Sequence, residues 1–192
     1  MMKFKDILTI SSGIPFSRIE EDFSAPSYSV YSQNDLQADL GITSVCIENK
    51  LLRTYDKVST VKTGDIIFSL ISGTAARVQA ARSGYIYSQN YAVLLPNPII
   101  DKNFLVYLIN CDQDVKHQFA ASMQGSQVLK YTLNQLRQLE LKTLPDLSIQ
   151  QAIGKIYMSQ NRLMTLKNRL IERENQYLLS SLNNLIKQEK NK

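Results

Sequence analysis

The segment VKTGDIIFSLISGTAARVQA carries small polar residues and arginines at spacings that suit anion binding. Ser72, Gly73 and Thr74 follow its apolar run, and Arg77 and Arg82 come shortly after them. Backbone N–H groups, small hydroxyls and guanidinium groups are common protein contacts to nucleic-acid phosphates. The segment lacks the lysine of a P-loop, and only one glycine follows the apolar run where a dinucleotide fingerprint needs three. We therefore expect it to bind a nucleic-acid phosphate, and a plain polar hairpin turn is the equally open alternative.

Residues that carry out catalysis are sparse in this chain. The one histidine, His117, lies in a segment with helical spacing, where we expect it on the polar face. Cys46 and Cys111 lack the paired spacing of a zinc or redox site, so we expect two buried thiols. No carboxylates have metal-ligand spacing, and Asn97-Pro98 is followed by isoleucine, which does not fit an adenine methylation motif. We therefore expect a chain that recognises a ligand without catalysis and has no metal or cofactor of its own.

The elements that must position these residues change character along the chain. In the first three quarters, short apolar runs are bounded by Gly, Ser, Asn and Pro, which is typical of strands and turns. We expect one strand over residues 66–71 and a short helix that includes 104–109. After Ser148, a candidate helix cap, the pattern is that of one long helix. The sequence thus predicts an α+β protein, with a globular mixed-sheet domain over residues 1–147 and a long C-terminal coiled-coil helix over residues 148–192.

The C-terminal helix repeats apolar pairs every seven residues, at Ile156-Tyr157, Leu163-Met164, Leu170-Ile171 and Tyr177-Leu178. Such a repeat is typical of a helix that packs along another helix. The sequence predicts no second helix of this length, so we expect the partner to be a second copy of the chain, with a different protein as the alternative. The residues expected in this dimer interface are Ile153, Ile156, Leu163, Leu170, Tyr177 and Leu178.

The formal net charge of +5 comes entirely from this helix. Residues 1–150 contain 14 Lys/Arg and 14 Asp/Glu, whereas residues 151–192 contain 8 and 3. Either the helix contacts nucleic acid or another acidic partner, or its basic side chains form a solvated face. The basic residues concerned are Lys155, Arg162, Lys167, Arg169 and Arg173.

The composition is that of a globular protein, with 44% hydrophobic and 20% charged residues. No apolar run is long enough to span a membrane, and the first residues lack the pattern of a secretory signal. We therefore expect a cytoplasmic protein without membrane partners.

Segments in order along the chain resemble the specificity subunit of type I restriction-modification systems. They are KFKDILTISSGIPFSR, VKTGDIIFSLISGTAARV, YIYSQNYAVLLPN followed by FLVYLIN, and QGSQVLKYTLNQLRQLELKTLPDLSIQQAIGKIY. The most specific features are the GDIIF strand, the Gly125-Ser126 turn and the Leu-Pro...Gln-Gln-x-x-Ile entry into the long helix. The resemblance covers nearly the whole chain and implies a DNA target recognition domain followed by a spacer helix.

This resemblance implies a subunit that recognises double-stranded DNA and catalyses no reaction itself. It implies a partner modification subunit, which binds S-adenosylmethionine and methylates adenine, and in complete systems a restriction subunit. Members of the family usually contain two recognition domains, each with its helix, whereas this chain has one of each. We therefore expect two chains to pair through their helices and read a bipartite palindromic site. A stand-alone dimeric DNA-binding regulator and a silent specificity cassette are the alternatives.

The expected DNA contacts divide into two chemical groups. The phosphate contacts that we expect are Arg77, Arg82, Lys130, Ser72 and Thr74. Base contacts require amides or aromatic hydroxyls in exposed loops. We expect two glutamines to read adenine, Gln124 and Gln127, and a polar recognition loop to present Tyr28, Tyr31 and Gln33. The sequence predicts neither the DNA motif nor the length of its spacer.

Overall fold

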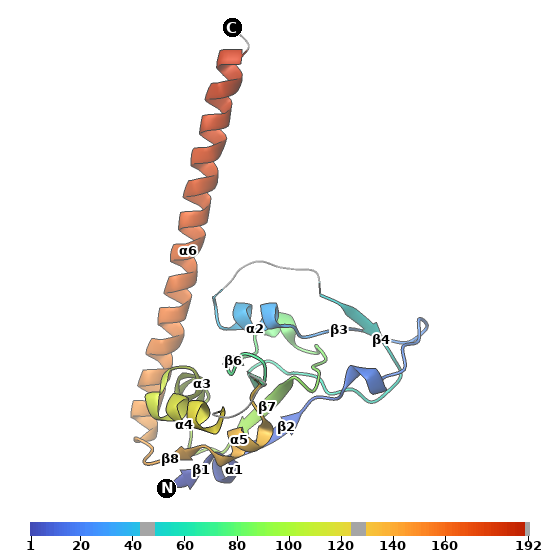
Figure 1. Cartoon of the computed structure of the whole chain (residues 1–192), viewed down its shortest axis with the longest axis vertical. Helices are drawn as coiled ribbons and strands as arrows, with labels where there is room; N and C mark the ends of the chain where they lie inside the picture. The colour runs from blue at the N-terminus through green and yellow to red at the C-terminus, as the bar shows by residue number, and fades with distance from the viewer. Residues whose placement is uncertain (43–48, 124–129, 191–192) are drawn as a thin grey trace.

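The structure is a computed structural model that describes residues 1–42, 49–123 and 130–190. Its helices and strands in chain order are β1 (Met2–Lys3), α1 (Phe4–Ile7), β2 (Leu8–Ser12), β3 (Ser27–Ser29), α2 (Gln33–Asp39), β4 (Leu51–Arg53), β5 (Ile66–Ser69), β6 (Ala75–Arg77), β7 (Tyr91–Pro96), α3 (Lys102–Cys111), α4 (Gln113–Met123), α5 (Leu133–Gln138), β8 (Glu140–Leu141) and α6 (Leu147–Lys190). Figure 1 shows a body formed by the elements up to β8, from which α6 projects as a single long arm. The predicted α+β fold with a long C-terminal helix is confirmed.

The centre of the body is a four-stranded antiparallel sheet in the order β2-β7-β5-β6. Its inner strands are apolar on both faces, because every side chain of β5 and the first four of β7 are buried. Strands covered on both sides have continuous apolar runs instead of alternating ones, which explains the sequence pattern. The strand expected over residues 66–71 is confirmed as β5, although it ends at Ser69. Two short ribbons, β1-β8 and β3-β4, lie outside this sheet.

Helix α3 lies between the sheet and the arm, with contacts to both β6 and α6. Asp101 caps its first turn, because the carboxylate accepts the N–H groups of Asn103 and Phe104. The apolar residues at the expected helical spacing are buried on α3. The short helix expected to include residues 104–109 is therefore confirmed.

The predictions for the single histidine and for the two cysteines differ in how they compare with the structure. His117 is exposed on α4, as expected for a residue of the polar face. Cys111 ends α3 and is only half-buried, which corrects the expectation of a buried thiol. Cys46 lies outside the described residues.

The start of α6 is fixed to the body by polar contacts and close packing. Gln150 is buried; its amide N–H groups donate to Ile99 O and Pro145 O, and its oxygen accepts the N–H of Asp101. Next to it, Gly154 packs directly on the first turn of α3. The helix begins at Leu147, so Ser148 lies inside the first turn and does not cap it.

Contact between α6 and the body ends near Thr165, which is buried beside the C-terminal end of α2. Among the side chains described beyond Thr165, none is buried. With a rise of 1.5 Å per residue, about 37 Å of helix extends past this point. Within the described ranges, neither this arm nor any other helix is apolar enough over a sufficient length to span a bilayer.

Candidate nucleic-acid interface

The turn between β5 and β6 is tight and depends on a glycine. Ser69 N–H donates to Thr74 O, and Gly73 N–H donates to Ser69 O, each at 2.9 Å. Gly73 has a φ of 67°, a conformation that other residues adopt only with strain. The ring of Tyr131 also lies against Gly73, so that a Cβ there would be 2.3 Å from Tyr131 Cζ. Both the backbone angle and the packed ring therefore require glycine at this position.

Three of the predicted site residues meet at this turn. Gln33, the first residue of α2, accepts a hydrogen bond from Ser69 Oγ and donates one to Ser72 Oγ, both at 3.1 Å. The hydroxyl of Ser72 also contacts that of Thr74. Gln33 and Ser72 are 39 residues apart in sequence, so the tertiary fold brings them together.

Lys130 and Tyr131 lie beside the same turn. Tyr131 N–H donates to Leu70 O at 2.9 Å, and its ring packs edge-on against Phe119. The side chain of Lys130 is exposed, and its Nζ donates to Asn90 Oδ1 at 2.9 Å. We name the group formed by Gln33, Ser72, Thr74, Lys130 and Tyr131 the turn cluster. Sequence reasoning missed Tyr131, because only its contact with the distant Gly73 places it here.

The backbone N–H groups of Leu70 to Gly73 in the turn are already bonded within the protein. Leu70 N–H donates to Asn90 O, and Gly73 N–H to Ser69 O. The N–H groups of Ile71 and Ser72 both donate to Ser69 Oγ. This corrects the expectation that the loop presents backbone N–H groups to an anion. The side-chain groups of the turn cluster are the Ser72 and Thr74 hydroxyls, the Gln33 amide and the exposed Lys130 ammonium, each of which would exchange a hydrogen bond within the protein for one to a ligand.

Arg77 lies at the opposite end of β6 from the turn. Its side chain is exposed, and Nη1 donates to Asn103 Oδ1 at 3.2 Å. Lys102 lies on the same first turn of α3 as Asn103 and donates to Gly64 O at 3.0 Å. Arg77 is therefore a cation next to the base of α6 and is not a member of the turn cluster.

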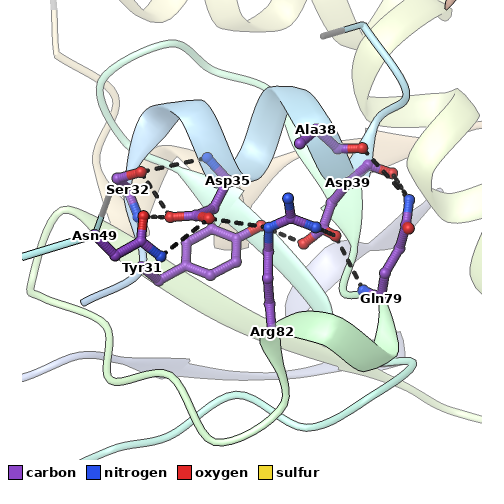
Figure 2. A network of polar contacts seen from close by, with 8 residues as sticks. All are labelled: Tyr31, Ser32, Asp35, Ala38, Asp39, Asn49, Gln79 and Arg82. Atoms are coloured by element: carbon purple, nitrogen blue, oxygen red, sulfur yellow. Dashed lines mark hydrogen bonds and ion pairs between the residues drawn. The ribbon is translucent and has the colours of Figure 1, made fainter. Parts of the chain in front are cut away.

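Arg82 is held in a buried polar network with two carboxylates of α2 (Figure 2). Its Nε donates to Asp35 Oδ1 at 3.0 Å and its Nη1 donates to Asp39 Oδ1 at 2.9 Å. Only 16% of the Arg82 side chain is exposed. This corrects the expectation that Arg82 contacts phosphate, because Asp35 and Asp39 already take up its charge.

Tyr31 belongs to the same network and to the core. The side chain is 1% exposed, and its hydroxyl donates to Asp39 Oδ2 at 2.7 Å. Burial, together with the charge of Asp39, raises the pKa of Tyr31 above its ordinary value. Burial also raises the pKa of Asp39, although hydrogen bonds from Tyr31 and Arg82 act in the other direction. Burial lowers the pKa of Arg82, but the Asp39 and Asp35 carboxylates outweigh it and the net shift is upward.

The expected recognition loop around residues 28–33 is instead β3 followed by the start of α2. Ser32 and Asp35 form a capping box, in which each side chain accepts the other's backbone N–H. The Ser-x-x-Asp spacing was the sequence signal for this helix start, and the loop expectation overlooked it. Tyr28 is half-buried in β3 opposite Leu52.

The remaining predicted residues lie on α6 or outside the described ranges. Gln124 and Gln127 lie outside the described ranges. Ile153 packs against the core of its own body, which corrects its assignment to a dimer interface. The other expected interface residues are exposed on α6, namely Ile156, Leu163, Leu170, Tyr177 and Leu178.

Comparisons with known proteins agree with this layout of a body and an arm. Residues 1–178 match the family model of the type I restriction modification DNA specificity domain. The crystal structure of the HsdS subunit from Thermoanaerobacter tengcongensis is similar with a TM-score of 0.54 and 14% identity, over 86% of this chain and 38% of that one. A second similar chain comes from a structure described as the structural basis of complex assembly and conformational transition of the type I R-M system. Its TM-score is 0.61 and its identity 16%, over 94% of this chain and 42% of that one.

The present chain therefore spans about two fifths of the length of these two solved chains. A search of curated proteins finds no match. Since the family model covers both the body and most of the arm, the chain belongs to the type I restriction-modification DNA specificity domain family.

Proposed function

We propose that this chain is a half-length specificity subunit that gives a type I restriction-modification complex its DNA sequence preference by acting as a homodimer. Membership of the specificity domain family supports the DNA-recognition role. The observation that carries the dimer is the row of exposed apolar side chains on α6, at Ile156, Leu163, Leu170, Tyr177 and Leu178. We name this row the apolar seam.

An apolar seam on a free arm is expected to be covered in solution. Leu163 and Leu170 are 45% and 58% exposed, and neither packs against the body. Two arms packed together would bury both seams and carry one body at each end of the pair. Because each chain spans about two fifths of its solved relatives, two copies approach the length of one such relative. Twofold symmetry then predicts two inverted half-sites separated by a fixed gap.

The chain itself would bind DNA, and a modification subunit would perform the chemistry. We propose that this partner binds S-adenosylmethionine and methylates adenine, that a restriction subunit joins in complete systems, and that the complex acts in the cytoplasm. The turn cluster suits base or phosphate contact, since it combines the Gln33 amide and the Ser72 hydroxyl with the exposed ammonium of Lys130.

Adenine methylation mapped across the genome, with and without this gene, tests the role. Loss of methylation at a gapped palindrome is the expected result, since a symmetric dimer reads inverted half-sites. Loss at an asymmetric gapped motif would retain DNA specificity but would require a different partner chain. Unchanged methylation would contradict the proposal and favour the regulator or the silent cassette.

The dimer is tested separately with Leu163→Glu combined with Leu170→Glu. Two carboxylates in a packed seam would be buried without partners, so the variant should sediment as a monomer at concentrations where the wild type is a dimer. The body should retain its thermal unfolding transition. The matched control is Gln176→Glu combined with Asn183→Glu, which adds two carboxylates seven residues apart at positions about 100° or more around the helix from the seam. A seam variant as dimeric as this control would refute pairing through α6.

The turn cluster is tested with single substitutions in the assembled complex. Lys130→Ala should weaken binding to all duplexes by a similar factor, because a phosphate contact carries no sequence information. Gln33→Ala should instead reduce discrimination between the correct motif and a motif with one changed base pair. Equal discrimination by wild type and Gln33→Ala would remove Gln33 from the proposed base contacts.

A further inference from the structure

The inner corner between the body and the arm forms a groove of about 520 Å³. On the body side, its walls are the C-terminal end of α2 and Gln79; on the arm side, they include Arg162 and Arg169. In Figure 1, α2 lies on the side of the body toward which the arm projects. We name this hollow the corner groove.

The exposed charge of the corner groove is positive. Arg162 and Arg169 are exposed, and neither forms an ion pair with any residue in the part of the chain that the structure describes. Asp39 is the only carboxylate among the lining residues, and its side chain is fully buried in an ion pair with Arg82. The Arg82 network therefore prevents Asp39 from neutralising the two arginines.

The two arginines belong to a longer basic row on α6. Lys155, Arg162 and Arg169 follow one another at seven-residue intervals, and Arg173 is one turn further along. The row spans roughly 27 Å at 1.5 Å per residue. At about 100° per residue, Lys155, Arg162 and Arg169 each lie about 100° around the helix from the seam residue that follows them, whereas Arg173 lies within about 60° of Leu170 and Tyr177. Pairing through the seam would therefore leave Lys155, Arg162 and Arg169 accessible, with Arg173 at the edge of the paired surface.

Helix α2 connects the corner groove to the turn cluster. It begins at Gln33 in the cluster and ends at Asp39 in the groove, so the two sites are separated by about 10 Å of helix. The major groove of DNA alone is about 12 Å wide. A duplex that engages the turn cluster is therefore wide enough to reach the corner groove as well.

We propose that Arg162 and Arg169 bind phosphates of the DNA segment between the two half-sites, so that the arm binds DNA in addition to setting the distance between the bodies. This inference rests on the proposed function and extends the DNA contact from the body to α6. Continuity with the turn cluster favours DNA over an acidic protein surface as the occupant. The arginines bind the backbone only, so they add affinity without sequence preference.

The test compares Arg162→Gln combined with Arg169→Gln against the wild type, in the complex assembled with its modification subunit. The probe is a duplex that contains the motif found by methylation mapping. The slope of log K against log salt should fall by about 0.9 for each phosphate that the variant no longer neutralises, or about 2 per chain. Discrimination against a changed motif should stay the same. Lys116→Gln combined with Arg137→Gln is the control, since it removes the same charge from exposed positions on α4 and α5 and should leave the slope unchanged.

The position of the contact is tested with a duplex whose spacer phosphates are replaced by neutral methylphosphonates. We call Arg162→Gln combined with Arg169→Gln the corner variant. The wild type and the control variant should bind the neutral-spacer duplex more weakly than the unmodified duplex. The corner variant should bind the two duplexes equally. An equal reduction in affinity for the corner variant and the wild type would overturn the proposal. So would unchanged DNA binding together with failure to assemble with the modification subunit, which would assign the arginines to a protein partner. Failure of the proposed function is distinguishable, because the wild-type complex would then show no motif preference at all.

Discussion

Gly154→Ala tests the contact that sets the direction of α6 against the body. A Cβ at Gly154 would lie 2.7 Å from Phe104 N and 2.8 Å from Asn103 Cβ. Favourable separations between carbon atoms are about 3.5–4.0 Å, so the two helices must separate by roughly 1 Å to admit the methyl group. The atoms that it meets include backbone, which cannot rotate away as the end of a flexible side chain can.

Two opposing effects decide the change in stability. Alanine in a helix interior is favoured over glycine by about 1 kcal/mol. Overpacking a close helix contact typically costs about 1–3 kcal/mol. The steric effect is the larger one, so we expect Gly154→Ala to reduce the free energy of unfolding by about 1 kcal/mol.

The same displacement has a small effect on the end of the arm. If α6 pivots on the Thr165 contact, about 16 Å from Gly154, a shift of 1 Å moves its far end by roughly 2 Å. This is less than the 3.4 Å rise of one base pair along a DNA strand. We therefore expect the length of the gap in the recognised motif to remain unchanged.

Urea unfolding followed by circular dichroism, at one fixed chain concentration, measures the stability change, because dimerisation adds a concentration-dependent contribution. The control is Ser159→Ala on an exposed position of α6, which gains helix propensity of a few tenths of a kcal/mol and meets no neighbour. The control should unfold at the same urea concentration as the wild type or a higher one, and Gly154→Ala at a lower one. If Gly154→Ala is as stable as the control, the close contact between α6 and α3 does not constrain the arm.

Three further predictions concern the body. Arg82→Met leaves two buried carboxylates, Asp35 and Asp39, without a cation and should cost about 3–5 kcal/mol in urea unfolding at pH 7; a reduction below about 1 kcal/mol would contradict the role of the network. Burial raises the pKa of Tyr91 to about 12. Above the unfolded pKa of about 10, the folded state therefore holds this proton more tightly than the unfolded state, and stability falls with rising pH by up to about 1.4 kcal/mol per unit. Tyr91→Phe should make this fall shallower between pH 10 and 11, and equal slopes in urea unfolding would refute the assignment. Gln150→Leu removes three hydrogen bonds at the start of α6 and should lower the free energy of unfolding by about 1–3 kcal/mol, whereas unchanged thermal and urea midpoints would show that those bonds are dispensable.

The parts of the fold that depend on local pattern were predictable. The seven-residue repeat of α6, the apolar run of β5 and the spacing of α3 each arise within one segment, and the structure confirms all three elements. The α2 helix was missed although its Ser32 and Asp35 capping box is also local. The polar residues before and within α2 have the composition of a loop, and only the Ser-x-x-Asp spacing distinguishes this helix start from a loop.

Two arginines show most clearly which properties of the site could not be predicted from the sequence, namely exposure and ion pairing. Arg77 and Arg82 are equivalent candidates in the sequence, but only Arg77 is exposed in the structure. Arg82 meets Asp35, which lies 47 residues earlier in the chain, and no local pattern indicates that pairing. Tyr131 likewise joins the turn cluster only because the fold places its ring on Gly73.

The sequence by itself determined that the chain has an α+β body and a basic, apolar-striped helical arm, because periodicity and charge are properties of neighbouring residues. Only the tertiary structure decided which polar residues are accessible at the turn cluster, which are buried in the Arg82 network, and where α6 leaves the body. These outcomes depend on contacts between segments far apart in the chain, and such contacts follow from the packing of the whole body.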